Sequence, residues 1–142
     1  MLILYPKRLN DQSPKRLNIM ETGLKHTSTM EVTADKTAAS VGSGDMPVLA
    51  TPMMMALMEN AAMLAVAPHL TEGETTVGGQ IESSHLAPTS VGKTVSATAT
   101  LVKAEGRKLF FEIEAHEGDK LLGKGTHLRF IVNREKFLGK LV

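Results

Sequence analysis

The sequence predicts a single α+β domain in which a curved antiparallel sheet of about five strands packs around one long buried helix. Two observations support this prediction. The segment LATPMMMALMENAAMLAVAPH, residues 49–69, consists mostly of good helix formers and is apolar on nearly every side. Much of the chain after it alternates apolar and polar residues between glycine turns, which is typical of antiparallel strands with one buried face.

The segment before the predicted helix divides into a leader and the start of the domain. Residues 1–19 contain PKRLN twice and have no periodic apolar face, so we expect a flexible N-terminal leader or arm. The single domain is then expected to cover residues 20–142. Within it, HTSTMEVT at 26–33 is compatible with a strand. ADKTAASVGSGDMP at 34–47 is rich in turn formers and predicts a loop.

The predicted helix has recognisable ends. Thr51 is a plausible N-cap, Pro52 suits the first helical position, and the helix is expected to stop near Pro68. Because both faces are apolar, we expect this helix to be buried nearly all round.

Four strands are expected after the helix. The first is VGGQIESSHLA at 77–87, and three more lie between 94 and 132, with turns at 105–106 and 118–119. The alternation predicts which side chains face the core: Val95, Ala97, Ala99, Leu101, Leu109, Phe111, Ile113 and Ala115. The remaining residues, 133–142, are interpreted as a short cap or tail.

Composition narrows the class of protein. The chain has 142 residues, is 42% hydrophobic and 22% charged, and carries a net charge of +1. These values indicate a soluble globular domain and give no reason to expect a nucleic-acid or membrane partner. The absence of cysteine excludes a disulfide framework and fits the cytoplasm. No serine-hydrolase elbow, phosphate loop, dinucleotide fingerprint or zinc-binding histidine motif occurs, so we expect neither a cofactor nor a metal.

Glu59 is the most informative residue, because it lies in the middle of the most apolar segment. An unpaired buried carboxylate is costly, so Glu59 must reach water, find a partner or take part in chemistry. Thr51 lies eight residues earlier, about 12 Å away along a helix, too far for direct contact within one chain. His85 lies where a strand opens into a loop. The structural alternatives are a simple cap for Thr51, an ion pair of Glu59 with Arg129, and a non-catalytic His85.

The ordered set of segments resembles the hotdog-fold acyl-CoA thioesterases, and in particular the fluoroacetyl-CoA thioesterase type. The matching pieces are LATPMMMALMENAAMLAVAPHL, TTVGGQIESSHLAPTSVG, EGRKLFFEIEAHEG and GTHLRFIVNREKF, which together cover nearly everything from about Leu24 to Phe137. The resemblance implies a hotdog fold, an acyl-CoA substrate and a homodimer with active sites at the subunit interface. A dimer of dimers is left open.

The resemblance also implies site residues. It assigns the catalytic roles to Thr51, Glu59 and His85, and it implies that the backbone N–H of Gly78 helps to hold the thioester oxygen. Arg129 is the cation that we expect to contact the CoA portion of the substrate, because THLR lies in a central-looking strand.

The function predicted is hydrolysis of short- to medium-chain acyl-CoA thioesters, with Glu59 as general base or nucleophile. The alternative is a hotdog protein that binds acyl-CoA without turnover, and a hotdog dehydratase is a weaker third reading. Fluoroacetyl specificity is not predicted. The segment SVGSGDMP is short and lacks aromatic residues where the fluoroacetyl-specific enzyme has a longer aromatic lid, and Asn60 stands where that enzyme has tryptophan.

Overall fold

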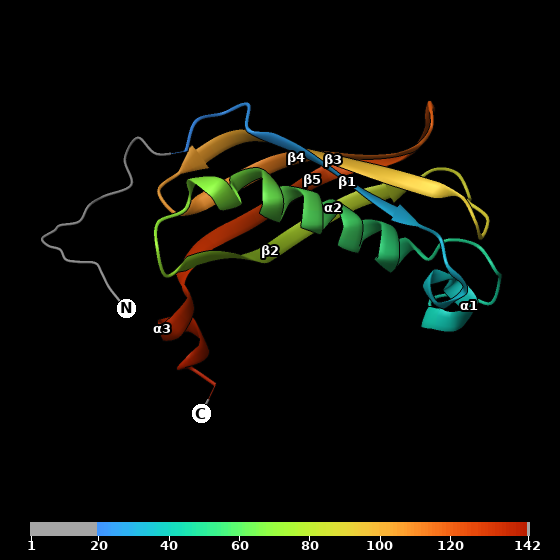
Figure 1. The fold of residues 1–142 in the computed structure, drawn as a ribbon, viewed down its shortest axis with the longest axis horizontal. Coiled ribbons are helices and arrows are strands. Elements are labelled where there is room, and N and C mark those ends of the chain that lie inside the picture. The colour runs from blue at the N-terminus through green and yellow to red at the C-terminus, as the bar shows by residue number, and fades with distance from the viewer. Residues whose placement is uncertain (1–19, 142) are drawn as a thin grey trace, which may run out of the picture.

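The computed structural model describes residues 20–141, and the predicted leader 1–19 lies outside the described residues. Five strands form one antiparallel sheet in the order β1-β3-β4-β5-β2. They are β1 (Lys25–Glu31), β2 (Glu74–His85), β3 (Thr94–Glu105), β4 (Lys108–Glu117) and β5 (Lys120–Asn133). The long helix α2 (Thr51–Val66) lies across one face of this sheet, as Figure 1 shows. The predicted α+β architecture is confirmed.

The core lies between α2 and the inner face of the sheet. All eight strand residues expected to point inward are at most 1% exposed: Val95, Ala97, Ala99, Leu101, Leu109, Phe111, Ile113 and Ala115. From the helix, the buried side chains are Met54, Leu57, Met58, Ala61, Ala62, Ala65 and Val66. Burial of this apolar surface is the main force that holds the helix on the sheet.

The expectation of a helix buried all round is wrong. Pro52, Ala56, Asn60 and Leu64 follow one another at a spacing of four residues, and all are exposed. The sheet of a single subunit covers only one side of α2, so these side chains remain uncovered in it. Asn60 nevertheless contributes to the structure, because its Oδ1 accepts a 2.7 Å hydrogen bond from Ser28 of β1.

The segment expected to be a loop contains short helical turns. A 3-10 helix, η1 (Ala34–Lys36), is followed by the single-turn helix α1 (Ala38–Val41). The hydroxyl of Thr37 caps α1 by accepting a hydrogen bond from the backbone N–H of Ser40, and Gly42 ends α1 in the left-handed region at φ 90°. Short-range capping therefore organises this segment beside the N-terminus of α2.

The remaining elements lie at the ends of the sheet. Helix α2 continues into a second 3-10 helix, η2 (Ala67–His69). The expected C-terminal cap is a short helix, α3 (Arg134–Leu138), which follows β5 directly and projects away from the sheet (Figure 1). None of the helices in residues 20–141 is long and apolar enough to cross a membrane.

Candidate active site

The hydroxyl of Thr51 is hydrogen-bonded to His85, with 2.7 Å between Oγ1 and Nδ1. Thr51 was predicted to be the helix N-cap, and this prediction is wrong. Ala50 occupies the cap position, and its carbonyl oxygen accepts the first helical hydrogen bonds, from the N–H groups of Met53 and Met54. The hydroxyl of Thr51 is thus available for a side chain on another element, which explains why a threonine stands here without capping the helix.

His85 is the last residue of β2, as the sequence indicated. Burial lowers the pKa of its imidazole, while the nearby backbone of Ala87 works in the opposite direction. Within the described part of the chain, its buried Nε2 has no hydrogen-bond partner. A buried ring nitrogen without a partner is unusual in a folded protein, so Nε2 marks this pair as a candidate functional group.

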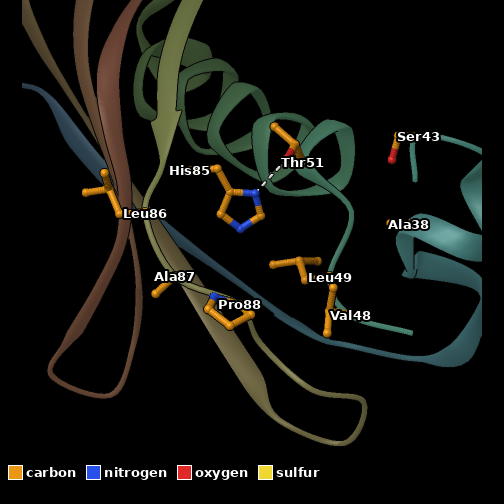
Figure 2. Close-up of a pocket in the computed structure, with 9 residues that line it drawn as sticks. All are labelled: Ala38, Ser43, Val48, Leu49, Thr51, His85, Leu86, Ala87 and Pro88. Carbon is orange, nitrogen blue, oxygen red and sulfur yellow. Dashed lines mark hydrogen bonds between the residues drawn. The ribbon is translucent and has the colours of Figure 1, made fainter. Parts of the chain in front are cut away.

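A cavity of about 290 Å³ lies beside the Thr51–His85 pair. Figure 2 shows the imidazole turned toward Thr51, with Leu49 and Pro88 near the ring and Ala38 and Ser43 farther off on the other side. The other lining residues come from the α1 segment and from the loop after β2: Ala38, Ser43, Val48, Leu86 and Ala87. The wall combines small and aliphatic side chains with three polar ones, Ser43, Thr51 and His85.

Glu59 lies in a second cluster, formed by the middle of α2 and by strands β2 and β5. Its side chain is half-buried and approaches Gly78 so closely that a Cβ there would lie 3.0 Å from Glu59 Oε2. The same point is 3.4 Å from His127 Cε1 and 3.5 Å from Arg129 Nη1. The absence of a side chain at Gly78 therefore keeps open a small space between a carboxylate and a guanidinium.

Arg129 is buried, with only 6% of its surface exposed. Its Nε donates a 2.9 Å hydrogen bond to Thr76 Oγ1, and its Nη2 donates a 3.0 Å hydrogen bond to the Thr76 carbonyl. Burial lowers the pKa of this guanidinium, and the Glu59 carboxylate opposes that effect. The Glu59 carboxylate therefore acts on Arg129 through its charge, from across the space beside Gly78.

His127 also belongs to this cluster, although the sequence alone did not single it out. Its Nε2 lies 3.2 Å from Arg129 Nη1, and its Nδ1 lies 2.7 Å from the Gln80 carbonyl oxygen. A signal was present in the sequence. His127 and Arg129 are two residues apart in the last strand, so they share the inward face, where polar side chains are rare.

The two clusters do not meet within one subunit. Thr51 and Glu59 are separated by about 12 Å of helical rise. Gly78 and His85 are seven positions apart on one strand, which corresponds to about 20 Å. One subunit thus presents a hydroxyl–imidazole pair in one place and a carboxylate, a guanidinium and a glycine backbone in another. Residues 20–141 contain no group of His, Asp and Glu side chains that could hold a metal ion.

The arrangement of the sheet and the helix identifies the fold. A five-stranded antiparallel sheet packed on one long helix is the hotdog fold, and the chain superposes on a hot-dog-like protein from Thermanaerovibrio acidaminovorans at 20% identity with a TM-score of 0.79, covering 89% of this chain and 93% of that one. A thioesterase superfamily member from Thermus thermophilus is 30% identical with a TM-score of 0.79, covering 85% and 90% of the two chains.

The particular family follows from closer matches. Residues 32–135 match the FlK family, described as fluoroacetyl-CoA-specific thioesterase. A fluoroacetyl-CoA thioesterase from Streptantibioticus cattleyicolor is 44% identical over 94 residues, which cover 66% of this chain and 68% of that protein. The solved structure of the fluoroacetyl-CoA thioesterase FlK is 38% identical with a TM-score of 0.80 and covers 86% of this chain and 95% of that one. The chain therefore belongs to the FlK family and is a thioesterase.

Proposed function

We propose that this thioesterase hydrolyses short- to medium-chain acyl-CoA thioesters to the free acid and CoA, at two sites that are each assembled across a homodimer interface. The observation that supports this arrangement most directly is the separation of the two polar clusters. Thr51 and His85 contact each other in one place, and Glu59 lies beside Gly78 in another. A thioester needs groups from both, and a second subunit can supply the missing half.

A CoA thioester is the natural substrate class for a member of this family. A threonine-to-serine variant of FlK was solved with acetyl-CoA, and that structure is 36% identical to this chain, covering 86% of it and 96% of the other, with a TM-score of 0.81. The cavity beside His85 is small, about 290 Å³, which suits a short or medium acyl chain better than a long one. None of its nine lining residues is Phe, Tyr or Trp.

The position of strand β2 in the sheet supports the proposed dimer. It is 12 residues long, and among residues 20–141 it stands at the edge of the sheet and pairs with β5 alone. A long strand with an unpaired backbone edge favours pairing with another strand. Antiparallel pairing of β2 with β2 of a second copy about a two-fold axis near Ile81 and Glu82 brings Gly78 close to His85 of the partner subunit. The Glu59 cluster of each subunit then faces the Thr51–His85 pair of the other.

The chemistry follows from these groups. Glu59 removes a proton from a water molecule that attacks the carbonyl carbon, or it attacks that carbon itself and forms an anhydride that water then hydrolyses. On either route the carbonyl carbon gains a C–O bond while the C–S bond breaks, and the products are the acid and the CoA thiol. The backbone N–H of Gly78 stabilises the oxyanion that forms at the carbonyl oxygen. His85 orients the water or donates a proton to the leaving thiolate, and Thr51 holds the imidazole in place. Arg129 keeps positive charge beside the Glu59 carboxylate and contacts the CoA portion of the substrate.

The experiment that tests this proposal is thiol release from a panel of acyl-CoAs, from acetyl to decanoyl and including fluoroacetyl-CoA. Wild type is compared with Glu59→Gln, which removes the charge and keeps the shape. Glu112→Gln is the matched control, because Glu112 is an exposed glutamate on β4. We expect turnover to collapse only in Glu59→Gln, with the fold and the dimer retained. A wild type that binds acyl-CoA without turnover, or a fully active Glu59→Gln, would overturn the proposal.

A further inference from the structure

A buried histidine outside the proposed catalytic set contacts both Arg129 and the part of β2 that contains Gly78 and Gln80. His127 is 3% exposed and lies on the inner face of β5, next to the ring of Phe111, with 6.1 Å between the ring centres. Both of its nitrogens are engaged, Nδ1 with the carbonyl oxygen of Gln80 at 2.7 Å and Nε2 with Nη1 of Arg129 at 3.2 Å. Buried side chains with every polar atom engaged are held in one orientation.

The partners of His127 determine its protonation. A guanidinium has only donors, so Nε2 of His127 must accept the hydrogen bond from Arg129. A backbone carbonyl only accepts, so Nδ1 must carry the proton and donate to Gln80. The ring is therefore neutral and in a single tautomer. The charged groups that face it are Arg129 of β5 and Glu59 of α2, while β2 offers the Gln80 carbonyl and β4 offers the uncharged ring of Phe111.

Each of the two hydrogen bonds fixes a part of the proposed site. The pairing of β2 with β5 shifts register between Gly78 and Gln80, so the carbonyl held by His127 belongs to the irregular stretch that contains Gly78. On its other side, His127 holds Nη1 of Arg129, while Thr76 holds Nε and Nη2. Nη1 is the nitrogen of Arg129 that approaches the space beside Gly78 and Glu59. One imidazole is therefore bonded to the stretch that contains Gly78 and also fixes the direction of the guanidinium.

We infer that His127 is a positioning residue for hydrolysis: its neutral ring, fixed in one tautomer by the Gln80 carbonyl, holds the Arg129 guanidinium beside Gly78 and the Glu59 carboxylate. This inference rests on the proposed function, because it assumes that Glu59 and Gly78 meet the substrate. His127 itself touches no reacting atom, and its effect on turnover passes through Arg129.

Two substitutions separate the hydrogen bonds of His127. In His127→Asn, the amide nitrogen stands near the position of Nδ1 and still donates to Gln80, but nothing reaches Arg129. In His127→Gln, the longer side chain brings an amide oxygen near the position of Nε2, where it accepts from Arg129. We expect kcat to fall about ten- to a hundredfold in His127→Asn, with a smaller change in KM, and to recover most of that loss in His127→Gln.

A double-mutant cycle with Arg129→Gln distinguishes positioning from general damage to the core. If His127 acts through Arg129, the His127→Asn substitution has little further effect on kcat once Arg129 is replaced. If the two substitutions instead lowered kcat by independent factors that multiply in the double variant, the inference would be contradicted. His116→Asn is the matched control, because His116 lies half-exposed on β4, with its Nε2 3.7 Å from Glu114 Oε1. Thermal unfolding and size-exclusion elution are measured for every variant.

The outcomes also separate this inference from the function on which it rests. Loss of turnover in Glu59→Gln together with full kcat in His127→Asn would overturn the role of His127 and leave the proposed function standing. Full turnover in Glu59→Gln would overturn the proposed function itself. Reduced kcat in both His127 variants, without recovery in His127→Gln, would show that the contact with Arg129 is not what matters and would also overturn the inference.

Discussion

Thr51 Oγ1 lies 2.7 Å from His85 Nδ1, although the two residues are 34 positions apart in the chain. This contact joins the first residue of α2 to the last residue of β2. It leaves Nε2 of His85, with no partner among the described residues, next to the cavity. The relationship makes the hydroxyl of Thr51 the group that determines how the imidazole faces a ligand.

We predict that Thr51→Val lowers kcat about tenfold or more, because valine keeps the shape of the side chain and removes its hydrogen bond to His85. Thr51→Ser keeps the hydroxyl and is expected to retain most of the activity. Thiol release under saturating acyl-CoA measures both. Thr98→Val is a suitable control, since Thr98 makes an exposed hydrogen bond to Thr27 on β1, remote from this pair in the sheet. Equal activity of wild type and Thr51→Val would contradict the role assigned to the hydroxyl.

Gly78→Ala is predicted to abolish most turnover with little loss of stability. The added methyl group would stand 3.0 Å from Glu59 Oε2 and occupy the space between the carboxylate and Arg129. The backbone of Gly78 does not have the positive φ that excludes other residues. Gly79→Ala is the informative contrast, because its methyl group would meet Phe130 Cε2 at 2.3 Å, so a loss of stability is expected there. Chemical denaturation and thiol release are compared for the two variants, and an active Gly78→Ala would contradict the account.

The buried histidines make stability depend on pH. Burial lowers the pKa of His127 in the folded protein, with Arg129 adding to the effect, so below the ordinary histidine pKa of 6.5 the unfolded chain binds a proton that the folded chain does not. The free energy of unfolding should therefore decrease as the pH falls from about 8 to about 5.5. His127→Gln removes this contribution and should show a shallower decrease in urea unfolding. If the free energy of unfolding of the variant fell with pH as steeply as that of wild type, or more steeply, His127 would not have a lowered pKa.

The sheet was predictable because its signal is local. Alternation at positions 95–101 and 109–115 identifies the buried face of two strands without knowledge of their neighbours. The helix was also evident from its residues, but its environment was not. How much of α2 is covered depends on how many elements pack on it, and the exposure of Ala56 and Leu64 reflects the single sheet beneath the helix.

The site was harder to predict for a different reason. Glu59 could be identified from the sequence because a carboxylate in an apolar helix requires an explanation. Thr51 had an ordinary explanation as a helix cap, and that explanation was wrong. The identity of the partner of Thr51 depends on where β2 ends in space, which no local pattern encodes. His127 was missed because a lone histidine in a strand is usually structural, and its importance emerges only from its contacts with Arg129 and Gln80.

A mixed dimer tests the proposal that each active site takes Glu59 from one subunit and His85 from the other. Glu59→Gln and His85→Asn chains carrying different affinity tags are co-expressed, and the mixed dimer is purified through both tags. Each homodimer should be inactive. The account predicts that the mixed dimer regains about half of the wild-type kcat per dimer, because one of its two sites then contains an intact Glu59 and an intact His85. A folded mixed dimer without activity would contradict the claim, since it would mean that both residues act within one subunit.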